Sequence, residues 1–510
     1  MEETAVSKVA RGSALLVAGQ MVSDIIATVA FMFIARALTK QEMGLASVVF
    51  FTSALGIIIS GAGVPTTIVR FISEARGREE DYRPFIMAGV MGQAILASLC
   101  SLVMVTMAGE LSEVLMGSQG HEVLFYLAAL NTILSGFNIL LSSILVGLEM
   151  MDGVCVAYIA SALVACPVSV MLILNGWGVM GYVSLWILNG LVGVLVLSFY
   201  LLSALRTRPG AVKEVVSSLR VLLKFSWPIL ITNLANYSFR FFDKYILAFL
   251  GSKEELGVYS VAFKAYTAIT MIPLNIAMAI FPYYGVKYGR DDLAAIRQST
   301  FLVSKYLSLL FVPVALGLAV VAEPVLVFFA GAKYAGGAKT LMILGFFGAL
   351  TAPTPLLGFL LITYKRAKTY MVANLASVGA SLALMPLFVP SLGVLLGTAL
   401  ARGLAMVFLL IFYTATTRDL ALLDWPSLAR GLVAGLIMAS AVYGVQAWLS
   451  NQPIFLPIYV ALGALVYGAC IRLLRALNDR DVVLLSNAFP KNMRGLVLAL
   501  GRLLAFKEES

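Results

Sequence analysis

Residues 39–50 read TKQEMGLASVVF, and residues 252–263 repeat this pattern as SKEELGVYSVAF. Lys, Glu, Gly, Ser, Val and Phe occupy identical positions in the two copies, and most other positions are conservative. Thr39 with Glu42, and Ser252 with Glu255, have the spacing of a capping box, in which a hydroxyl and a carboxylate satisfy the first amides of a helix. Each copy is therefore predicted to start a helix.

The composition on either side of this repeat is that of an integral membrane protein. Hydrophobic residues make up 61% of the chain, charged residues make up 12%, and the mean hydropathy is +0.96. Soluble domains carry roughly a quarter of their residues as Asp, Glu, Lys and Arg. A soluble protein of this composition could not cover its own exterior, so membrane lipid must cover it.

Apolar stretches of about twenty residues recur along the whole chain, and each can cross a hydrocarbon core about 30 Å thick. We expect an all-α polytopic membrane protein with about fourteen transmembrane helices. The shortest breaks, 175–181 and 391–393, leave twelve or thirteen spans if they do not divide helices. The expected spans are 12–35, 45–69, 85–108, 122–147, 153–175, 179–203, 225–250, 258–283, 301–322, 340–363, 370–390, 393–416, 428–449 and 453–475.

The two copies of the repeat lie six expected spans apart, so both halves would insert in the membrane with the same orientation. Parallel repeats of this kind form transporters whose substrate site lies between the halves. The expected parts are an N-terminal six-helix lobe at 1–205, a cytoplasmic linker at 206–224, a C-terminal six-helix lobe at 225–417, two additional transmembrane helices at 418–475 and a cytoplasmic amphipathic tail at 476–510.

The formal net charge of +10 is explained by topology rather than by nucleic-acid binding. Most Lys and Arg residues fall in loops that would share one side of the membrane. The opposite loops hold only Arg36, Lys40, Lys253 and Lys333. This asymmetry follows the positive-inside rule and predicts that both termini are cytoplasmic.

The sequence has no motif for an ATP motor or for membrane-embedded catalysis. A phosphate-binding loop, a zinc-protease motif and a hydrolase nucleophile motif are all absent. His121 is the only histidine, and the four cysteines lack metal-ligand spacing. We therefore expect no catalytic residue, no metal and no cofactor, and a transporter fits better than an enzyme.

Ionisable side chains inside a span cost about 2.5–3.5 kcal/mol each, so they indicate function. The span at 225–250 carries the richest set, and its polar members fall on an arc of roughly 120° at 100° per residue. Arg240 and Asp243 could instead neutralise each other, but Lys244 would remain. The set comprises Asn233, Asn236, Tyr237, Arg240, Asp243 and Lys244.

Three further charged residues lie inside other expected spans. Lys264 and Arg402 would complete a cationic substrate site with Arg240 and Lys244 if the two lobes face each other. Asp24 lies in the first span, and either it or Asp243 could carry a coupling proton or sodium ion. The alternative for Asp24 is a polar contact between packed helices.

The runs FDKYIL at 242–247 and ELGVYSVAFK at 255–264 resemble the signature of a known family. The family is the polysaccharide-type (oligosaccharide-lipid) flippases of the multidrug/oligosaccharidyl-lipid/polysaccharide exporter superfamily. Their second lobe typically opens with Asp-Arg, followed by Gly-x-Tyr-Ser-x-Ala. Here Lys244 replaces the Arg, which retains the charge but weakens bidentate phosphate contact. Residues 36–44 look like the first-loop pattern of the same family. The resemblance extends over most of the chain in length and span count, whereas its specific motifs cover about fifty residues.

The resemblance implies a flippase that carries a sugar on polyprenyl phosphate or pyrophosphate across a prokaryotic cytoplasmic membrane by alternating access. Its expected partners are that lipid-linked sugar, membrane lipid, and the glycosyltransferases and polymerase of the same pathway, and no nucleic acid. A cation-coupled multidrug exporter is one rival, although its cavity should be acidic. A peptidoglycan-precursor flippase is a close cousin, and the Gly-x-Tyr-Ser loop favours the polysaccharide branch. A membrane-embedded glycosyltransferase or polymerase subunit would need acidic residues in longer loops.

Overall fold

The computed structural model describes the chain except residues 1, 205–211, 479–480, 483–493, 495–500 and 502–510. The described residues are almost entirely helical and form two compact units, 1–260 and 261–510. Residues 206–211 of the expected linker lie outside the described residues, as does most of the expected amphipathic tail. The five-part division of the chain stays a prediction.

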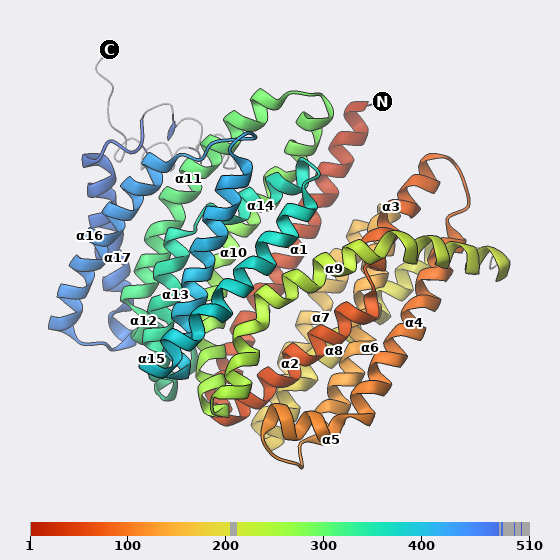
Figure 1. The fold of residues 1–510 in the computed structure, drawn as a ribbon, viewed down its shortest axis with the longest axis horizontal. Helices are drawn as coiled ribbons and strands as arrows, with labels where there is room; N and C mark the ends of the chain where they lie inside the picture. The colour runs from red at the N-terminus through yellow and green to blue at the C-terminus, as the bar shows by residue number, and fades with distance from the viewer. Residues whose placement is uncertain (1, 205–211, 479–480, 483–493, 495–500, 502–510) are drawn as a thin grey trace. The chain divides into compact units, whose positions relative to one another are not determined.

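The first unit holds a bundle of long helices joined by short turns (Figure 1). The helix that contains the expected span at 225–250 begins earlier, at Val212. The elements are α1 (Glu2–Ala37), α2 (Lys40–Gly61), α3 (Val64–Gly77), α4 (Arg83–Thr106), α5 (Ala108–Leu111), η1 (Ser112–Met116), α6 (Glu122–Gly147), α7 (Met151–Leu172), η2 (Ile173–Trp177), α8 (Gly178–Ala204), α9 (Val212–Leu250) and the start of α10 (Lys253–Gly289).

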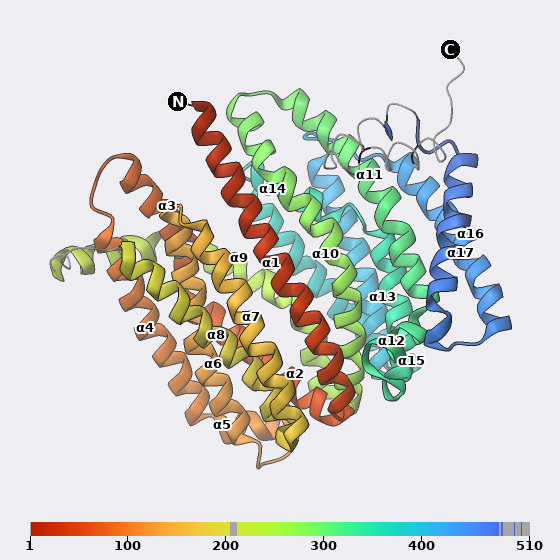
Figure 2. The same cartoon turned by 180° about the vertical axis from the view of Figure 1, so that it is seen from behind.

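Helix α9 packs within the first unit, against α2, α3 and α4. On the other side of the bundle, α1 packs along α7, as seen from behind in Figure 2. Helices α3, α6 and α9 share a core in which Ile68, Ile72, Leu140 and Leu222 are fully buried. These contacts fix α9, which carries most of the predicted site residues, against its neighbours.

A break between α2 and α3 bends the second expected span. Ala62 and Gly63 have φ values of 47° and 76°, and α3 follows with Pro65 in its first turn. A Cβ atom on Gly63 would meet the backbone carbonyl of Ser226 in α9. Glycine is therefore required here both for its backbone conformation and for the close approach of α9.

Both capping boxes predicted from the repeat are confirmed. The Thr39 hydroxyl accepts a hydrogen bond from the Glu42 amide at 3.2 Å, and the Glu42 carboxylate accepts one from the Thr39 amide at 2.8 Å. Ser252 and Glu255 make the same reciprocal pair at 3.1 and 2.8 Å. Each copy of the repeat therefore starts its helix in the predicted way.

The two copies also touch each other, through their glycines. A Cβ atom on Gly44 would meet the carbonyl oxygen of Lys253, and a Cβ atom on Gly257 would meet the carbonyl oxygen of Lys40. The contact is reciprocal, because each copy supplies one glycine and one lysine carbonyl at equivalent positions. The repeat is thus a packing unit with local twofold character, and its glycines permit the close approach.

Removing one capping hydroxyl should weaken the fold by a measurable amount. Ser252→Ala is expected to destabilise the protein by about 1 kcal/mol, because the Glu255 amide loses the hydroxyl that accepts its hydrogen bond. The midpoint of thermal unfolding in detergent measures the effect. Ser252→Thr is the matched control, since it keeps the hydroxyl; equal midpoints for both variants would contradict the role of the cap.

The second unit continues α10 and adds the remaining helices of the described chain. One pair within it, 332–350 and 354–363, is bent by 51° at a short break. The elements are α11 (Leu293–Val320), α12 (Ala322–Ala330), η3 (Ala332–Gly337), α13 (Ala338–Leu350), α14 (Thr354–Thr363), α15 (Ala367–Thr417), α16 (Trp425–Leu449), η4 (Pro453–Phe455) and α17 (Leu456–Leu473).

Helix α15 is a helical hairpin rather than one rod. Gly393 is non-helical, with φ of 81°, at the predicted break. The Ser377 hydroxyl donates to the Ala405 carbonyl at 2.7 Å, and the rings of Tyr370 and Tyr413 stack at 5.9 Å, so the two halves run antiparallel.

An ion pair closes the open end of this hairpin. Arg366, just before α15, pairs with Asp419, just after it. The hydrogen bonds from Arg366 lower the pKa of the exposed Asp419 carboxyl. The same hydrogen bonds to Asp419 raise the pKa of the Arg366 guanidinium. The pair therefore remains ionised at neutral pH and joins the two ends.

The predicted break at 175–181 also reverses the chain. Gly176 is non-helical, with φ of 87°, and α7 packs along α8. The Ser169 hydroxyl donates to the Gly181 carbonyl at 2.6 Å, and a Cβ atom on Gly153 would meet the ring of Tyr200. Residues 151–203 therefore fold back on themselves.

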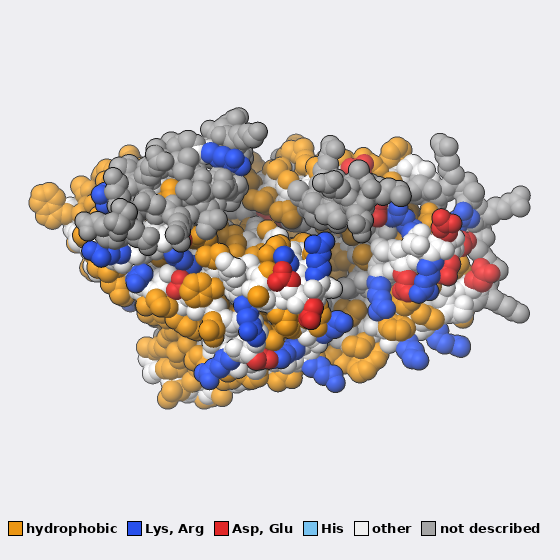
Figure 3. All heavy atoms as spheres, turned by 90° about the horizontal axis from the view of Figure 1, so that it is seen from above, with side chains coloured by type: hydrophobic (Ala, Val, Ile, Leu, Met, Phe, Trp, Pro, Cys, Tyr) orange, Lys and Arg blue, Asp and Glu red, His pale blue; other side chains and the backbone are white. Residues whose placement is uncertain are grey.

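By length and apolar composition, eleven segments of the described chain can cross a membrane, or up to twelve with the bent pair counted as one span. Two of these segments, 151–203 and 367–417, contain the reversals described above, and the fourteen spans expected stay a prediction. An all-α polytopic membrane protein is confirmed. Figure 3 shows Lys and Arg side chains among hydrophobic and acidic ones on the face that it views.

Candidate functional site

Lys244 lies among aromatic rings in the first unit. Its side chain is buried, 7% exposed, and its ammonium lies 5.0 Å from the ring centre of Phe241 and 5.9 Å from that of Phe50. Phe50 in turn packs against Trp186 at 5.0 Å. Ring faces stabilise a cation by about 0.5–2 kcal/mol without adding a negative charge. The rings therefore lower the cost of burying the ammonium.

Asp243, next to Lys244, joins α9 to α10. Its carboxylate accepts hydrogen bonds from the Tyr259 hydroxyl and from the Lys244 amide, the latter at 2.9 Å. Asp243 and Tyr259 are both fully buried. The Asp and the Tyr of the family-like signature are thus hydrogen-bonded partners. These contacts account for the buried acid structurally, and a coupling role for Asp243 stays a prediction.

Tyr237 ties α9 to α2. Its hydroxyl donates to the Phe51 carbonyl at 2.7 Å and lies 2.6 Å from the Tyr245 hydroxyl. The ring of Tyr245 packs on that of Phe51 at 4.2 Å. Tyr237 therefore holds the predicted polar face of α9 against α2.

The remaining predicted residues of α9 are less enclosed. Arg240 is exposed, and its guanidinium lies 5.6 Å from the Phe241 ring centre. Asn233 and Asn236 are half-buried on the same helix. With two cations and one acid, the ionised groups of Arg240, Asp243 and Lys244 sum to a charge of +1.

Arg402 repeats the arrangement of Lys244 in the second unit. It lies on the second half of α15, is 5% exposed, and its guanidinium lies 4.7 Å from the ring centre of Phe263 on α10. Lys264 follows Phe263 on α10 and is half-buried. Arg402 and Phe263 thus form a second buried cation–aromatic pair.

The two pairs occupy equivalent places in the repeat. Phe50 ends the first copy and Phe263 ends the second, and each ring lies beside a buried cation of its own unit. The cations come from other helices, α9 for Lys244 and α15 for Arg402. The repeat therefore supplies one aromatic support for a cation in each unit. A cavity shared by the two units stays a prediction.

Asp24 makes hydrogen bonds within α1. It is half-buried on α1, where its carboxylate accepts a hydrogen bond from the Gln20 amide at 2.9 Å and its carbonyl accepts one from Thr28 at 2.7 Å. The contact with Gln20 is within the helix, and a polar contact between packed helices stays the alternative for Asp24. Asp24 stays a candidate for ion coupling.

An apolar cavity of about 580 Å³ lies in the second unit. Helices α11, α16 and α17 form most of its wall, so the two helices beyond the second predicted lobe contribute to it. Its lining includes Tyr306, Pro313, Met438, Tyr467 and Leu477.

Sequence reasoning found the cations but missed their surroundings. Phe50 and Phe263 were identical in the repeat, and this identity was the available signal for their shared role. Phe241 and Trp186 gave no signal, because single aromatic residues in apolar helices are common. The pairing of Asp243 with Tyr259 could not be read from a spacing of sixteen residues across a helix break.

Comparisons with known proteins agree with this architecture. A family model described as polysaccharide biosynthesis protein matches residues 9–285, more than half of the chain, and a second, MatE, matches residues 228–387. None of the curated proteins matches the sequence.

Solved structures show the same fold at low sequence identity. A structure of the lipid II flippase MurJ in an inward closed conformation has a TM-score of 0.73 at 15% identity, covering 92% of this chain and 100% of that one. An inward-facing structure of a multidrug resistance MATE family transporter of the MOP superfamily has a TM-score of 0.60 at 16% identity. The match covers 80% of this chain and 98% of that one. A MOP superfamily transporter from Pyrococcus furiosus is described as having a binding pocket of reverse polarity. Its structure has a TM-score of 0.59 at 16% identity, covering 85% of this chain and 96% of that one. The chain has the MOP superfamily fold.

Proposed function

Because the chain belongs to the polysaccharide biosynthesis protein family, we propose that it moves a lipid-linked oligosaccharide across a prokaryotic cytoplasmic membrane by alternating access. The chain is a MOP superfamily transporter and not an enzyme. The cargo is a sugar on polyprenyl phosphate or pyrophosphate, used for surface polysaccharide or glycoprotein assembly. Glycosyltransferases and a polymerase of the same pathway are its functional partners.

The observation that carries the proposal is the pair of buried cations, Lys244 and Arg402, each held on an aromatic ring at the same position of the repeat. Phosphate oxygens are strong acceptors for Lys and Arg, and a buried setting strengthens such charge-assisted hydrogen bonds. Arg240, Lys264, Asn233 and Asn236 would contact the rest of the headgroup. A cationic drug would be repelled by the same charges.

The apolar cavity supports a lipid anchor on the cargo. Its wall of α11, α16 and α17 suits a polyprenyl chain, which needs apolar surface while the sugar crosses. A lipid-linked cargo also agrees with the fold, which a lipid II flippase shares. A peptidoglycan precursor has the same anionic lipid chemistry, so the family match is the reason for choosing a polysaccharide cargo.

We infer fourteen membrane crossings from the two reversals. Eleven segments can cross a membrane by length and composition, and the bent pair adds one more span. Two of the eleven, 151–203 and 367–417, each become two spans when they are divided at Gly176 and Gly393, which gives fourteen. An even number of crossings places both termini on one side of the membrane. The positive-inside rule makes that side the cytoplasm.

Transport assays on the reconstituted protein test the cargo. We expect proteoliposomes to move a fluorescently labelled polyprenyl-pyrophosphate oligosaccharide, measured by the fraction that an added membrane-impermeant quencher reaches. Vesicles without protein give the background rate. Ethidium, with and without a proton gradient, represents a cationic drug. Transport of ethidium together with a background rate for the lipid-linked sugar would establish the multidrug exporter instead.

A further inference from the structure

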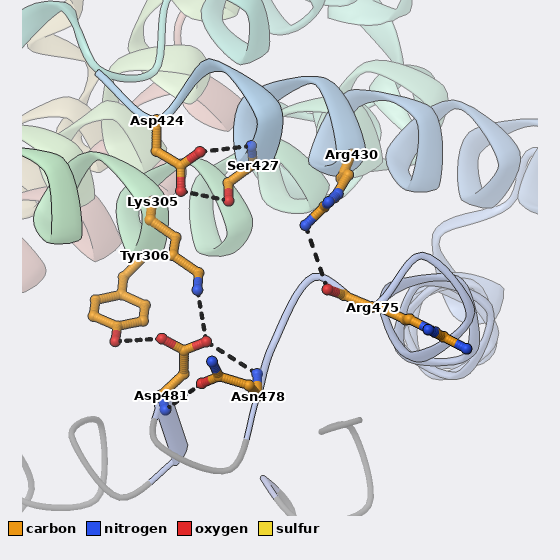
Figure 4. A network of polar contacts seen from close by, with 8 residues as sticks. All are labelled: Lys305, Tyr306, Asp424, Ser427, Arg430, Arg475, Asn478 and Asp481. Carbon is orange, nitrogen blue, oxygen red and sulfur yellow. Dashed lines mark hydrogen bonds and ion pairs between the residues drawn. The ribbon is translucent and has the colours of Figure 1, made fainter. Parts of the chain in front are cut away.

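An internal carboxylate occupies a cluster of donors on the second unit (Figure 4). The Lys305 ammonium donates to one oxygen of Asp481 at 2.6 Å, and the Tyr306 hydroxyl donates to the other at 2.9 Å. The Asn478 amide adds a third hydrogen bond at 3.0 Å. The side chain of Asp481 is 6% exposed and that of Lys305 is 16% exposed. Asp481 is therefore enclosed by donors.

The same stretch of α11 is fixed by a second polar contact. Ser304 accepts a hydrogen bond from the Asp424 amide at 2.9 Å, and Asp424 caps the start of α16 through Ser427. Figure 4 shows Asp424 and Ser427 beside the Lys305 side chain. Lys305 and Tyr306 therefore lie beside a hydrogen-bonded junction between α11 and the start of α16.

These donors lie at one end of the apolar cavity. Tyr306 lines the cavity, as does Leu477, which is four residues before Asp481. Along α11 the cavity wall extends from Tyr306 to Val320. A lipid chain in the cavity with its phosphate at this end would bring phosphate oxygens to Lys305 and Tyr306.

The chemistry of the donor set suits a phosphate as well as a carboxylate. The Lys305 ammonium and the Tyr306 phenol are both donors of the kind that bind phosphate oxygens in proteins. A neutral lipid that displaced Asp481 would leave the Lys305 charge unpaired in a buried place, whereas an anionic lipid would exchange one anion for another. The arrangement therefore distinguishes anionic from neutral lipids.

We propose that Lys305 and Tyr306 form an entry site for the phosphate of the lipid-linked cargo, and that Asp481 occupies this site until the cargo displaces it. This rests on the proposed function, because it assigns the cavity to the cargo's lipid chain. Asp481 then acts as an internal competitor that sets the affinity for anionic lipid and excludes uncharged polyprenols.

Lipid binding to the full-length protein in nanodiscs tests this site. The probes are a polyprenyl monophosphate and the polyprenol of the same chain length, and binding is measured by native mass spectrometry. We expect Asp481→Asn to bind the monophosphate at least threefold more tightly than wild type, because the competing charge is gone. Lys305→Met should bind it at least threefold more weakly, and adding Asp481→Asn to Lys305→Met should give no gain. Asp291→Asn, an exposed acid before α11, is the matched control and should match wild type.

A second measurement needs no variant. Polyprenyl monophosphate added to the wild-type protein should speed hydrogen exchange at the amides of Asn478 and Asp481, whereas polyprenol should not. Unchanged or weaker monophosphate binding by a folded Asp481→Asn protein, or unchanged exchange in wild type, would overturn the proposal. Transport of the lipid-linked sugar by wild type is measured in a separate experiment. A negative result in the lipid-binding experiment therefore does not change the transport result, and a negative transport result does not change the lipid-binding result.

Discussion

Lys244→Met and Arg402→Met are each expected to slow transport of a lipid-linked oligosaccharide at least tenfold. Each substitution removes the charge but keeps an unbranched side chain against its ring. A hydrogen bond to a charged group contributes about 1.5–3 kcal/mol, and about 1.4 kcal/mol corresponds to a factor of ten. The measurement is the initial rate in proteoliposomes at equal protein incorporation.

Charge-conserving substitutions separate electrostatics from packing in the same assay. Lys244→Arg should keep most of the rate, and it installs the residue that is usual at this place in the resembling family. Lys333→Met is the matched control, because Lys333 also lies beside an aromatic ring, 5.5 Å from that of Tyr334, but outside the repeat. Transport by Lys244→Met and Arg402→Met at the rate of Lys333→Met would remove the role assigned to the two buried cations.

Much of the fold could be predicted because bilayer physics leaves few choices. Apolar stretches of the right length indicated the spans, and both short breaks contain a glycine with positive φ, Gly176 and Gly393. The start of α9 at Val212 was missed, since that first part of the helix is polar enough to resemble a linker. Hydropathy detects the part of a helix that membrane lipid covers. It does not detect the part of the same helix that extends beyond the lipid.

The candidate site was predicted less completely, for a different reason. Charged residues inside spans are conspicuous, so Lys244 and Arg402 were found from the sequence. Their ring partners Phe50 and Phe263 depend on which helices pack together, and a single sequence does not specify that. Asp481 was overlooked because an acid in a basic tail resembles an ordinary surface residue, yet it is buried against Lys305.

Gly257→Ala is expected to destabilise the protein by about 2 kcal/mol, because its new Cβ atom would overlap the Lys40 carbonyl at a packed contact. The Lys40 carbonyl is a backbone group, so it cannot move away from the added atom as the end of a flexible side chain could. Gly285→Ala, on the same helix with nothing within 4 Å of the added atom, is the matched control and should be neutral or slightly stabilising. The midpoint of thermal unfolding in detergent gives the comparison, and equal midpoints for the two variants would contradict the close approach.

The reciprocal contact makes a sharper prediction for Gly44→Ala. Its Cβ atom would overlap the Lys253 carbonyl, so the single variant should lose about as much stability as Gly257→Ala. Once one substitution has pushed the two copies of the repeat apart, the other glycine no longer needs to be small. The double variant should therefore lose clearly less than the sum of the single losses, since the two residues share one contact. Additive losses would mean that the two glycines pack independently and that the repeat has no common contact.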